Sequence, residues 1–468
     1  LSIRRQRQMC IRDSILTTGE GIDTIVANAG DDIILSGGGN DIITAGAGRD
    51  NIDAGAGNDT INVTVDTDFE VSGGTETIDG GAGTDTLVFS QAQAHNFSSA
   101  EMGSIKNIEV INVDATTGSN STVIGLSDTF MSNNNDAITV IAPINTNKAG
   151  DINVNGAAVG TGSIRLILKG DVTETADTLT GGAGDDVLQV GYARADSPGT
   201  DGVNEELEGG AEGDVFTGNG GTDVIELHNV GDQADATPTA GTGDITVTLD
   251  FDNVTGVEKM QVMDSNGVTT GAADPITVTV DGLTATTTKM PATFEYDGSV
   301  ITDTADVQDF NYSSQTAADN DALTTDFTIT TGYGADKVGG SGGDDTISTG
   351  VGNDSIFGGG RSDTIDGGTG DDLINGGDET ALTGVGDSLS GGSGADTIDG
   401  DGGADTILGG DGADIITGGA GADIRFDFAS MGILNDGGVV VAYHDSSDPD
   451  PLFAVEIEMP IYGPNNQN

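Results

Sequence analysis

Aspartate and glycine recur at a fixed period through much of the sequence, and together they provide oxygen ligands for a cation. Between residues 18 and 62 an aspartate comes every nine residues, with a glycine two positions before it and an isoleucine two positions after it. The unit is G-G-x-G-x-D-x-U-x, where U is a large aliphatic residue. Ca²⁺ prefers carboxylate and carbonyl oxygens. We therefore treat the phased aspartates as candidate calcium ligands: Asp23, Asp32, Asp41, Asp50, Asp59, Asp85, Asp177, Asp186, Asp214, Asp223, Asp336, Asp345, Asp354, Asp363, Asp372, Asp387, Asp396, Asp405, Asp414 and Asp423.

The spacing predicts how the chain must place these side chains. The last three residues of a unit can form a short strand with U pointing inward, and the glycine-rich first six must reverse the chain. Two units then make one coil of eighteen residues, and coils stack at about 4.8 Å, the ordinary spacing of strands. Asp23 should lie over Asp41 and share an ion with it. Backbone carbonyls near the turn glycines should complete the sites, at Gly37, Gly39, Gly55, Gly57, Gly350, Gly352, Gly368, Gly370, Gly392, Gly394, Gly410 and Gly412.

A metal-free glycine solenoid, in which aspartate merely favours turns, is the alternative interpretation of the same period. Stacked carboxylates would repel one another in such a fold. The aspartates also keep their phase and do not alternate freely with Asn or Ser. Both observations favour the calcium-binding interpretation.

Residues 181–186, 367–372 and 391–396 carry the full consensus, and through them the sequence resembles the RTX (repeats-in-toxin) family of haemolysin-type calcium-binding repeats. The resemblance implies a parallel β-roll with Ca²⁺ in its turns and export by a type I secretion apparatus through a C-terminal signal. Departures from the consensus mark weaker sites, since Glu76 and Glu205 replace Asp. Arg425 stands at the U position of the last unit, where we expect it to cap the roll.

The pattern predicts an all-β chain in which RTX β-rolls alternate with other β-rich segments. The rolls are residues 15–88, 173–226 (degenerate) and 331–426. Two mutually similar β-modules, residues 89–172 and 227–330, lie between them, and both are rich in β-branched residues and short alternating runs. The tail, residues 427–468, leaves the pattern and is a candidate secretion signal.

Residues 1–14 differ from the rest, because they are basic and carry the only cysteine, Cys10. They resemble translated adapter sequence, so we leave them out of the predicted fold; the alternative is a genuine basic N-terminal arm.

Composition limits the partners of the chain. It has 77 acidic and 15 basic residues and a formal net charge of −62. Nucleic acid is therefore excluded as a partner, because its phosphates would be repelled. No apolar run approaches the length that crosses a membrane. Together with the repeats, this composition predicts an extracellular protein.

The motifs of catalysis are absent or misplaced. Residues 339–343 spell G-x-S-x-G, but they lie inside a nonapeptide block, whereas the nucleophile motif needs a strand, a sharp turn and a helix. None of the three histidines lies in an H-E-x-x-H motif. We therefore predict no catalytic residue and no enzymatic activity.

Two function hypotheses remain. In the first, the chain is a structural protein of a cell surface, similar to a surface-layer protein or adhesin, that self-associates or attaches to the cell envelope. In the second, it is the C-terminal export and folding region of a larger secreted enzyme or toxin. A catalytic domain upstream would decide for the second.

Overall fold

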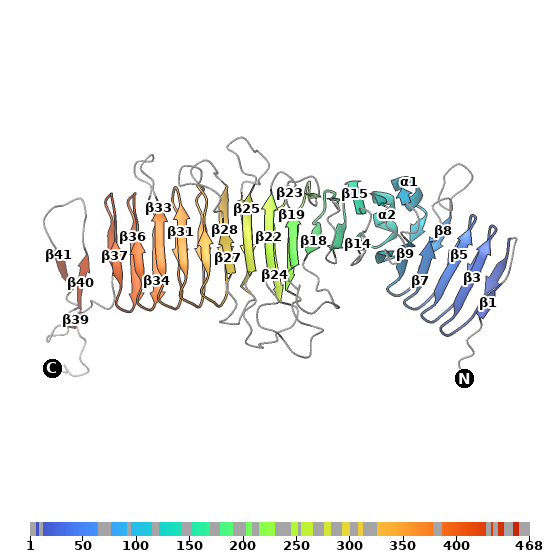
Figure 1. Cartoon of the computed structure of the whole chain (residues 1–468), viewed down its shortest axis with the longest axis horizontal. Helices are drawn as coiled ribbons and strands as arrows, with labels where there is room; N and C mark the ends of the chain where they lie inside the picture. The colour runs from blue at the N-terminus through green and yellow to red at the C-terminus, as the bar shows by residue number, and fades with distance from the viewer. Residues whose placement is uncertain are drawn as a thin grey trace, which may run out of the picture. The chain divides into compact units, whose positions relative to one another are not determined.

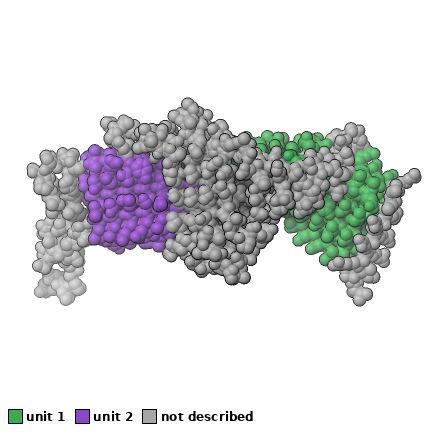
Figure 2. Space-filling model, in the orientation of Figure 1, with its two compact units in different colours: residues 1–234, 249–260 green, residues 235–248, 261–468 purple. Residues whose placement is uncertain are grey.

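The structure is a computed structural model and is built almost entirely of parallel strands. It describes residues 6–8, 13–63, 76–90, 95–114, 121–142, 152–168, 178–190, 203–207, 215–229, 245–250, 254–264, 276–281, 293–299, 308–311, 325–377, 386–426, 432–433, 439–443 and 453–457. The chain divides into two compact units, residues 1–234 with 249–260 and residues 235–248 with 261–468 (Figure 2).

The first roll consists of two parallel sheets whose strands alternate along the chain. One sheet contains β2 (Ile15–Thr17), β4 (Ile33–Leu35), β6 (Asn51–Asp53), β8 (Thr77–Asp79) and β11 (Ile105–Lys106). The other contains β3 (Thr24–Ala29), β5 (Ile42–Ala47), β7 (Thr60–Val63) and β9 (Thr86–Ser90), and Figure 1 shows β3, β5 and β7 side by side. Ile25 pairs with Ile43 and Ile34 with Ile52, which is the offset of eighteen residues that the repeat predicts. The inward residues Ile34, Ile43 and Ile61 are 0% exposed and form the thin core.

The N-terminal residues join this register as well. Strand β1 (Gln6–Gln8) pairs with β3 in parallel, and Gln6 lies beside Thr24, again eighteen residues on. The backbone of residues 6–8 therefore extends the sheet by one strand, while the interpretation of residues 1–14 as adapter sequence is still a prediction.

The segment after the first roll continues the same parallel stacking with longer coils. Strands β12 (Val110–Asp114), β14 (Ala137–Ala142), β16 (Ser163–Leu168), β18 (Val187–Val190) and β21 (Val224–Asn229) follow β9. The facing sheet contains β10 (His95–Phe97), β13 (Thr122–Ser127), β15 (Ile152–Ala158), β17 (Thr178–Thr180), β20 (Val215–Thr217) and β23 (Val254–Thr255). Thr86 pairs with Val110 and Ala137 with Ser163, so these coils are longer than eighteen residues.

The longer coils hold extra elements and larger core residues. Two short helices, α1 (Ser99–Met102) and α2 (Asp128–Asn133), are N-capped by Ser98 and Ser127. Their apolar side chains, such as Met102 and Phe130, are 0% exposed. The first β-module is therefore β-rich, as predicted. Its strands β12, β14 and β16 extend one sheet of the roll, β11 ends the other, and β10, β13 and β15 belong to a separate sheet. Strands β19 (Val203–Leu207), β22 (Ile245–Asp250) and β24 (Lys259–Asp264) are the remaining strands before the second unit's main body.

The second unit repeats the architecture. One sheet contains β25 (Ile276–Asp281), β27 (Gln308–Asn311), β29 (Lys337–Gly339), β31 (Ser355–Gly359), β33 (Leu373–Gly377), β35 (Thr397–Asp399) and β37 (Ile415–Thr417). The other contains β26 (Thr293–Asp297), β28 (Asp326–Thr330), β30 (Thr346–Ser348), β32 (Thr364–Asp366), β34 (Ser388–Ser393), β36 (Thr406–Asp411) and β38 (Ile424–Phe426).

Its first coils have an aromatic core. Phe310 packs edge-on against Phe327, with ring centroids 6.1 Å apart, and lies 4.9 Å from Tyr296. The wider coils there need the larger side chains, since Thr293 pairs with Asp326 thirty-three residues on. From Thr328 onward aliphatic residues fill the core, and the offset is eighteen except where Thr364 pairs with Ser388 and Leu373 with Thr397, twenty-four residues on.

The tail differs from the rolls in strand direction. Strands β39 (Gly432–Ile433), β40 (Val439–Tyr443) and β41 (Phe453–Ile457) pair antiparallel. Among the described residues, no helix has the length and apolar character needed to cross a membrane.

Candidate calcium sites

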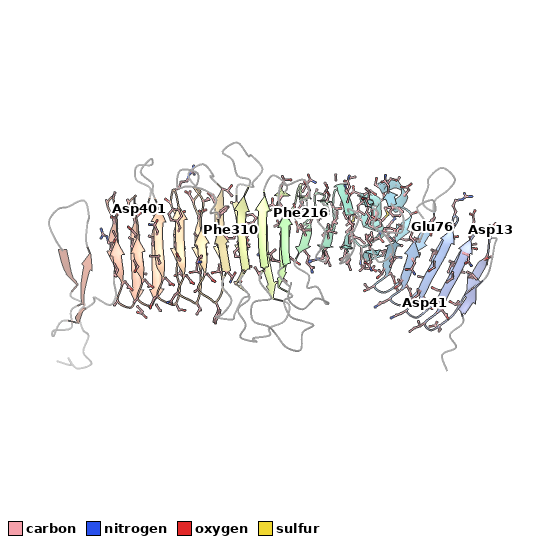
Figure 3. All side chains as sticks on the ribbon, viewed as in Figure 1. Asp13, Asp41, Glu76, Phe216, Phe310 and Asp401 are labelled. Atoms are coloured by element: carbon pink, nitrogen blue, oxygen red, sulfur yellow. The ribbon has the colours of Figure 1, made fainter. Side chains whose placement is uncertain are left out.

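The phased aspartates stack in columns along the edges of the rolls, one coil above the next. The backbone N–H of Asp23 donates to Oδ1 of Asp41 at 2.7 Å, and that of Asp41 donates to Oδ1 of Asp59 at 2.7 Å. The column on the other edge contains Asp32 and Asp50, joined in the same way at 2.7 Å. Glu76 follows Asp50 on that edge, since Asn51 pairs with Thr77, and Figure 3 labels Asp41 and Glu76 on opposite edges of this roll. The stacking of residues eighteen apart is therefore observed, and one carboxylate oxygen of each pair is fixed by it.

The third block forms the same two columns. Along one edge the N–H groups of Asp336, Asp354, Asp372 and Asp396 donate at 2.8–3.0 Å to Oδ1 of Asp354, Asp372, Asp396 and Asp414. Along the other edge Asp345, Asp363, Asp387 and Asp405 donate to Oδ1 of Asp363, Asp387, Asp405 and Asp423 at 2.8–3.3 Å. The interruption after residue 376 lengthens one coil to twenty-four residues without breaking either column.

The second carboxylate oxygen points into the roll. Within the described part of the chain, Oδ2 of Asp372, Asp396, Asp405 and Asp414 is buried and has no hydrogen-bond partner. Leaving a buried charged acceptor unsatisfied costs about 1–3 kcal/mol or more. Several such oxygens in one column therefore indicate that a further group belongs there.

A backbone carbonyl lies close to Oδ2 of Asp372, Asp396 and Asp405. A methyl group added to Gly391 would stand 2.3 Å from Oδ2 of Asp396 and 2.6 Å from the carbonyl oxygen of Gly409, one coil later. At Gly400 the distances are 2.4 Å to Oδ2 of Asp405 and 2.8 Å to the carbonyl oxygen of Gly418. We call this space the inner cradle of a unit: it lies beside the unit's first residue, between the unit's own Asp Oδ2 and the first carbonyl of the next coil. Its oxygen donors are those that Ca²⁺ prefers.

The last inner cradle already holds a positive charge. A methyl group on Gly418 would stand 2.3 Å from Oδ2 of Asp423 and 2.6 Å from both Nε and Nη2 of Arg425. The guanidinium thus lies where the carbonyl of a following coil would otherwise be, and Nη2 is 3.6 Å from Oδ2 of Asp423. A cation therefore fits the chemistry of the cradle. The prediction that Arg425 caps the roll agrees with this placement.

Burial raises the pKa of several aspartates in the columns. It raises the pKa of Asp50, Asp85, Asp372 and Asp405 to about 6, while the hydrogen bond from the preceding coil works in the opposite direction. Burial raises the pKa of Asp223 to about 7, and neighbouring Asp186 and Glu258 add to the effect. The fold therefore disfavours bare negative charge at these positions, and a bound cation would offset that penalty.

The turn glycines have the conformation that tight reversal needs. All twelve glycines named for their carbonyls have φ between 87° and 157°, where other residues are strained. A methyl group on Gly370 would lie 1.6 Å from the carbonyl oxygen of Gly352 in the coil before it. The turns therefore stack backbone on backbone with no room for a side chain; whether their carbonyls ligate an ion is still a prediction.

The columns also contain two residues that the sequence interpretation missed. The N–H of Asp85 donates to Oε2 of Glu109 at 2.8 Å, and that of Asp223 donates to Oε2 of Glu258 at 2.9 Å. Each glutamate thus takes the aspartate position in the first coil of a β-rich segment. The signal was available, because Ile108-Glu109 and Val257-Glu258 occupy equivalent offsets in the two similar segments.

The other predicted residues of this region are only partly placed. Asp59 donates to Oδ1 of Asp85 at 2.8 Å across a longer coil, and Asp186 donates to Oδ1 of Asp223 at 2.8 Å. Asp177 and Asp214 lie outside the described residues.

A second ladder runs along the exposed side of the turns, at the residue before each phased aspartate. The N–H of Asp371 donates to Oδ1 of Asn353 at 3.0 Å, and that of Ala395 donates to Oδ1 of Asp371 at 2.8 Å. Here the later coil donates to the earlier one, the reverse of the buried columns. The Asp and Asn side chains at this exposed position therefore also join neighbouring coils.

The described residues contain no group of three or more His, Cys, Asp or Glu side chains that could hold a metal ion. Such a group is not expected at an inner cradle, because the cradle combines a single carboxylate with backbone carbonyl oxygens. Ser341, the serine of the G-x-S-x-G match, is 0% exposed and its Oγ donates to the carbonyl of Thr325 at 2.7 Å. The match is thus part of a roll turn.

A parallel β-roll with stacked aspartates is the class of protein that these features define. The family model for the RTX calcium-binding nonapeptide repeat (4 copies) matches residues 12–43, 36–69, 71–88, 172–191, 200–232, 328–356, 357–379 and 387–424. The chain therefore carries RTX calcium-binding repeats in all three predicted blocks. No curated protein matches the sequence.

Proposed function

We propose that this calcium-binding repeat protein folds on Ca²⁺ outside the cell and serves a structural role at a cell surface. The observation that carries the calcium-dependent folding is the convergence of a buried Asp Oδ2 and a carbonyl oxygen in each inner cradle, as at Asp396 and Asp405. Each bound ion would supply two positive charges to a chain with a net charge of −62.

Calcium concentration would then act as the signal for folding. Extracellular calcium modules bind with Kd of about 10⁻⁴–10⁻³ M. At the far lower calcium of a cytosol the chain would stay unfolded, a state suited to passage through a type I secretion apparatus. Outside, mass action would drive the fold.

The surface role is supported by the negative charge along the turns of the rolls. The exposed ladder residues, such as Asp31 and Asp344, leave acidic side chains along the turns. Divalent ions can bridge or screen such surfaces, so we expect the chain to self-associate or attach to the envelope, as in a surface layer or an adhesin, only in calcium-rich surroundings.

Circular dichroism during a calcium titration of the full chain tests the folding part. The β signal should be weak in excess chelator and should develop between about 10⁻⁴ and 10⁻³ M free Ca²⁺. Magnesium at the same concentration is the control, because its small octahedral shell fits a carbonyl cradle poorly. A full β signal in chelator would refute calcium-dependent folding.

Light scattering and electron microscopy above the folding midpoint test the surface part. Ordered assemblies, or binding to cells of the producing organism, are the expected results. A folded chain that stays monomeric and binds no envelope would instead favour the alternative, in which these repeats serve the export and folding of a larger secreted enzyme.

A further inference from the structure

The first residue of the nonapeptide divides the coils into two kinds. In one kind it is glycine, at Gly80, Gly181, Gly218, Gly340, Gly358, Gly367, Gly391, Gly400, Gly409 and Gly418, and Gly376 takes the same place beside Asp387 across the interruption. In the other it carries a side chain, at Thr18, Ala27, Ser36, Ala45, Ala54, Thr331 and Thr349. The side-chain kind makes up the first block from Thr18 to Ala54, whereas the glycine kind dominates the third.

Glycine leaves the inner cradle open. At Gly367 an added methyl group would stand 2.6 Å from Oδ2 of Asp372 and 2.9 Å from the carbonyl oxygen of Gly391. Oδ2 of Asp372 is buried and has no hydrogen-bond partner within the described residues, but the same holds for Asp41 and Asp354 in coils of the other kind, so the two kinds differ at the carbonyl and not at the carboxylate. Carboxylate and carbonyl therefore face a space that no atom of the unit's own first residue enters. The Gly340 unit is an exception, because Oδ2 of its Asp345 accepts the N–H of Ser341 at 2.6 Å.

Where the first residue of a unit is Ser or Thr, its hydroxyl donates a hydrogen bond to the carbonyl of the first residue one coil later. That carbonyl is the one that faces an open cradle. Oγ1 of Thr331 donates to the carbonyl of Thr349 at 3.0 Å, and Oγ1 of Thr349 donates to that of Gly367 at 3.0 Å. In the first block, Oγ of Ser36 donates to the carbonyl of Ala54 at 2.6 Å. These side chains are at most 3% exposed. The carbonyl is thereby satisfied within the protein.

Alanine fills the same space with a methyl group. Ala27, Ala45 and Ala54 are at most 3% exposed and lie among the inward-facing core residues of the first roll. A methyl group supplies no oxygen donor, and it occupies volume beside the aspartate. In the first block, Gly80 is the first glycine to occupy the first position of a unit.

We propose that the first residue of each nonapeptide determines which inner cradles bind calcium. Glycine leaves a cradle open to the ion, and Ser, Thr or Ala closes it. This inference rests on the proposed calcium-dependent folding and assigns it to particular coils. The coils from Gly358 to Gly409 carry most of the calcium requirement, whereas the coils from Thr18 to Asp59 hold together with fewer ions.

Hydrogen–deuterium exchange of the full chain across a calcium titration resolves the two kinds of coil. The amides of β34 and β36 should become protected only as calcium rises. Those of β4 and β5 should change less over the same range, because their cradles are closed without an ion.

Two opposite substitutions test whether the first residue of a unit determines its calcium response. Gly391 lies outside the left-handed region, so its φ allows serine. The added Cβ would lie 2.3 Å from Oδ2 of Asp396 and 2.6 Å from the carbonyl oxygen of Gly409, so Gly391→Ser must displace both groups, and its Oγ should then bond that carbonyl. The calcium concentration for half-protection of β34 and β36 should then rise about tenfold, which corresponds to about 1.4 kcal/mol. Thr349→Gly should open a cradle and increase the calcium response of the neighbouring β30 and β32. Ala395→Ser, on an exposed turn position of the same coil as Gly391, is the matched control. It should change the calcium midpoint of neither pair of strands.

The outcomes separate this inference from the function on which it rests. A wild-type chain that shows no calcium-dependent protection anywhere would refute the proposed function. A wild-type chain that responds to calcium while Gly391→Ser and Thr349→Gly keep its midpoints would refute the inference alone. If Gly391→Ser fails to fold at any calcium concentration, the direction of the Thr349→Gly effect still decides the matter.

Discussion

At the scale of single residues, each phased aspartate has two separate tasks. Oδ1 of Asp405 accepts the N–H of Asp387 at 2.9 Å and so joins two coils, while its buried Oδ2 faces the inner cradle. An asparagine could supply one such oxygen, but it would bring no charge to the cradle. This division explains why the sequence keeps aspartate in phase and varies the exposed position before it among Asp, Asn, Ala and others.

The cap residue provides a first prediction. Arg425→Leu would restore the aliphatic consensus but leave the buried Oδ2 of Asp423 without its ion pair. We expect the last coil to lose about 1–3 kcal/mol of its local opening free energy in calcium-poor buffer, the cost of an unsatisfied buried charged group. Hydrogen exchange of β38 measures this loss. Arg425→Lys keeps the charge and is the control; equal protection in wild type and Arg425→Leu would contradict the role given to the guanidinium.

The raised pKa values of the column aspartates provide a second prediction. The pKa of Asp50 and Asp405 rises from 3.8 to about 6 in the fold because of burial. The folded chain then binds protons more tightly than the unfolded chain, so in chelator its stability is greatest near the lower value and is lost as pH rises through about 6. Calcium competes with those protons. Circular dichroism should show more β structure in chelator at pH 4.5 than at pH 7.5, whereas the calcium needed for folding should increase as pH falls below about 6. Greater calcium-free β structure at pH 7.5 would contradict this sign.

At the scale of elements, strand pairing could be predicted where the nine-residue period is strict. A unit of nine residues with one inward aliphatic determines an eighteen-residue coil, so the pairing of Ile25 with Ile43 followed from the sequence. The longer coils could not be predicted, because strand pairing across twenty-two to thirty-seven residues leaves no repeated mark in the sequence. Glu109 and the filled first positions, such as Thr349, were missed for a similar reason. Their role depends on which atoms of the neighbouring coil lie beside them.

The stacked turns provide a third prediction, on the glycines of positive φ. Gly370 has a φ of 137°, and a methyl group there would lie 1.6 Å from the carbonyl of Gly352. Gly370→Ala should therefore destabilise its roll by more than the about 1–3 kcal/mol that backbone strain alone costs. Gly19→Ala is the matched control, because nothing lies within 4 Å of its added methyl and its φ is not positive. Chemical denaturation in saturating calcium measures both; similar losses would show that turn stacking is not the constraint.

At the scale of the whole molecule, the fold must bring an excess of acidic residues into stacked columns. With 77 acidic and 15 basic side chains, the chain repels itself in water. Two kinds of charge contribute: exposed acids such as Asp31, at 50% side-chain exposure, and buried cradle oxygens such as that of Asp405. Simple salt screens the exposed acids over a Debye length of about 8–10 Å, but screens buried groups much less.

That distinction leads to the last prediction, which concerns the size of the chain in solution. In chelator at low salt, small-angle scattering should show an expanded chain, and 0.5 M NaCl should shrink it only partly, because sodium chloride cannot replace ligands inside the cradles. Millimolar calcium at low salt should compact it fully and give the β signal, since each ion neutralises charge where the protein is desolvated. Potassium chloride at equal ionic strength controls for effects specific to sodium. Full compaction with β structure in sodium chloride and chelator alone would show that general repulsion, and not the inner cradles, keeps the calcium-free chain unfolded.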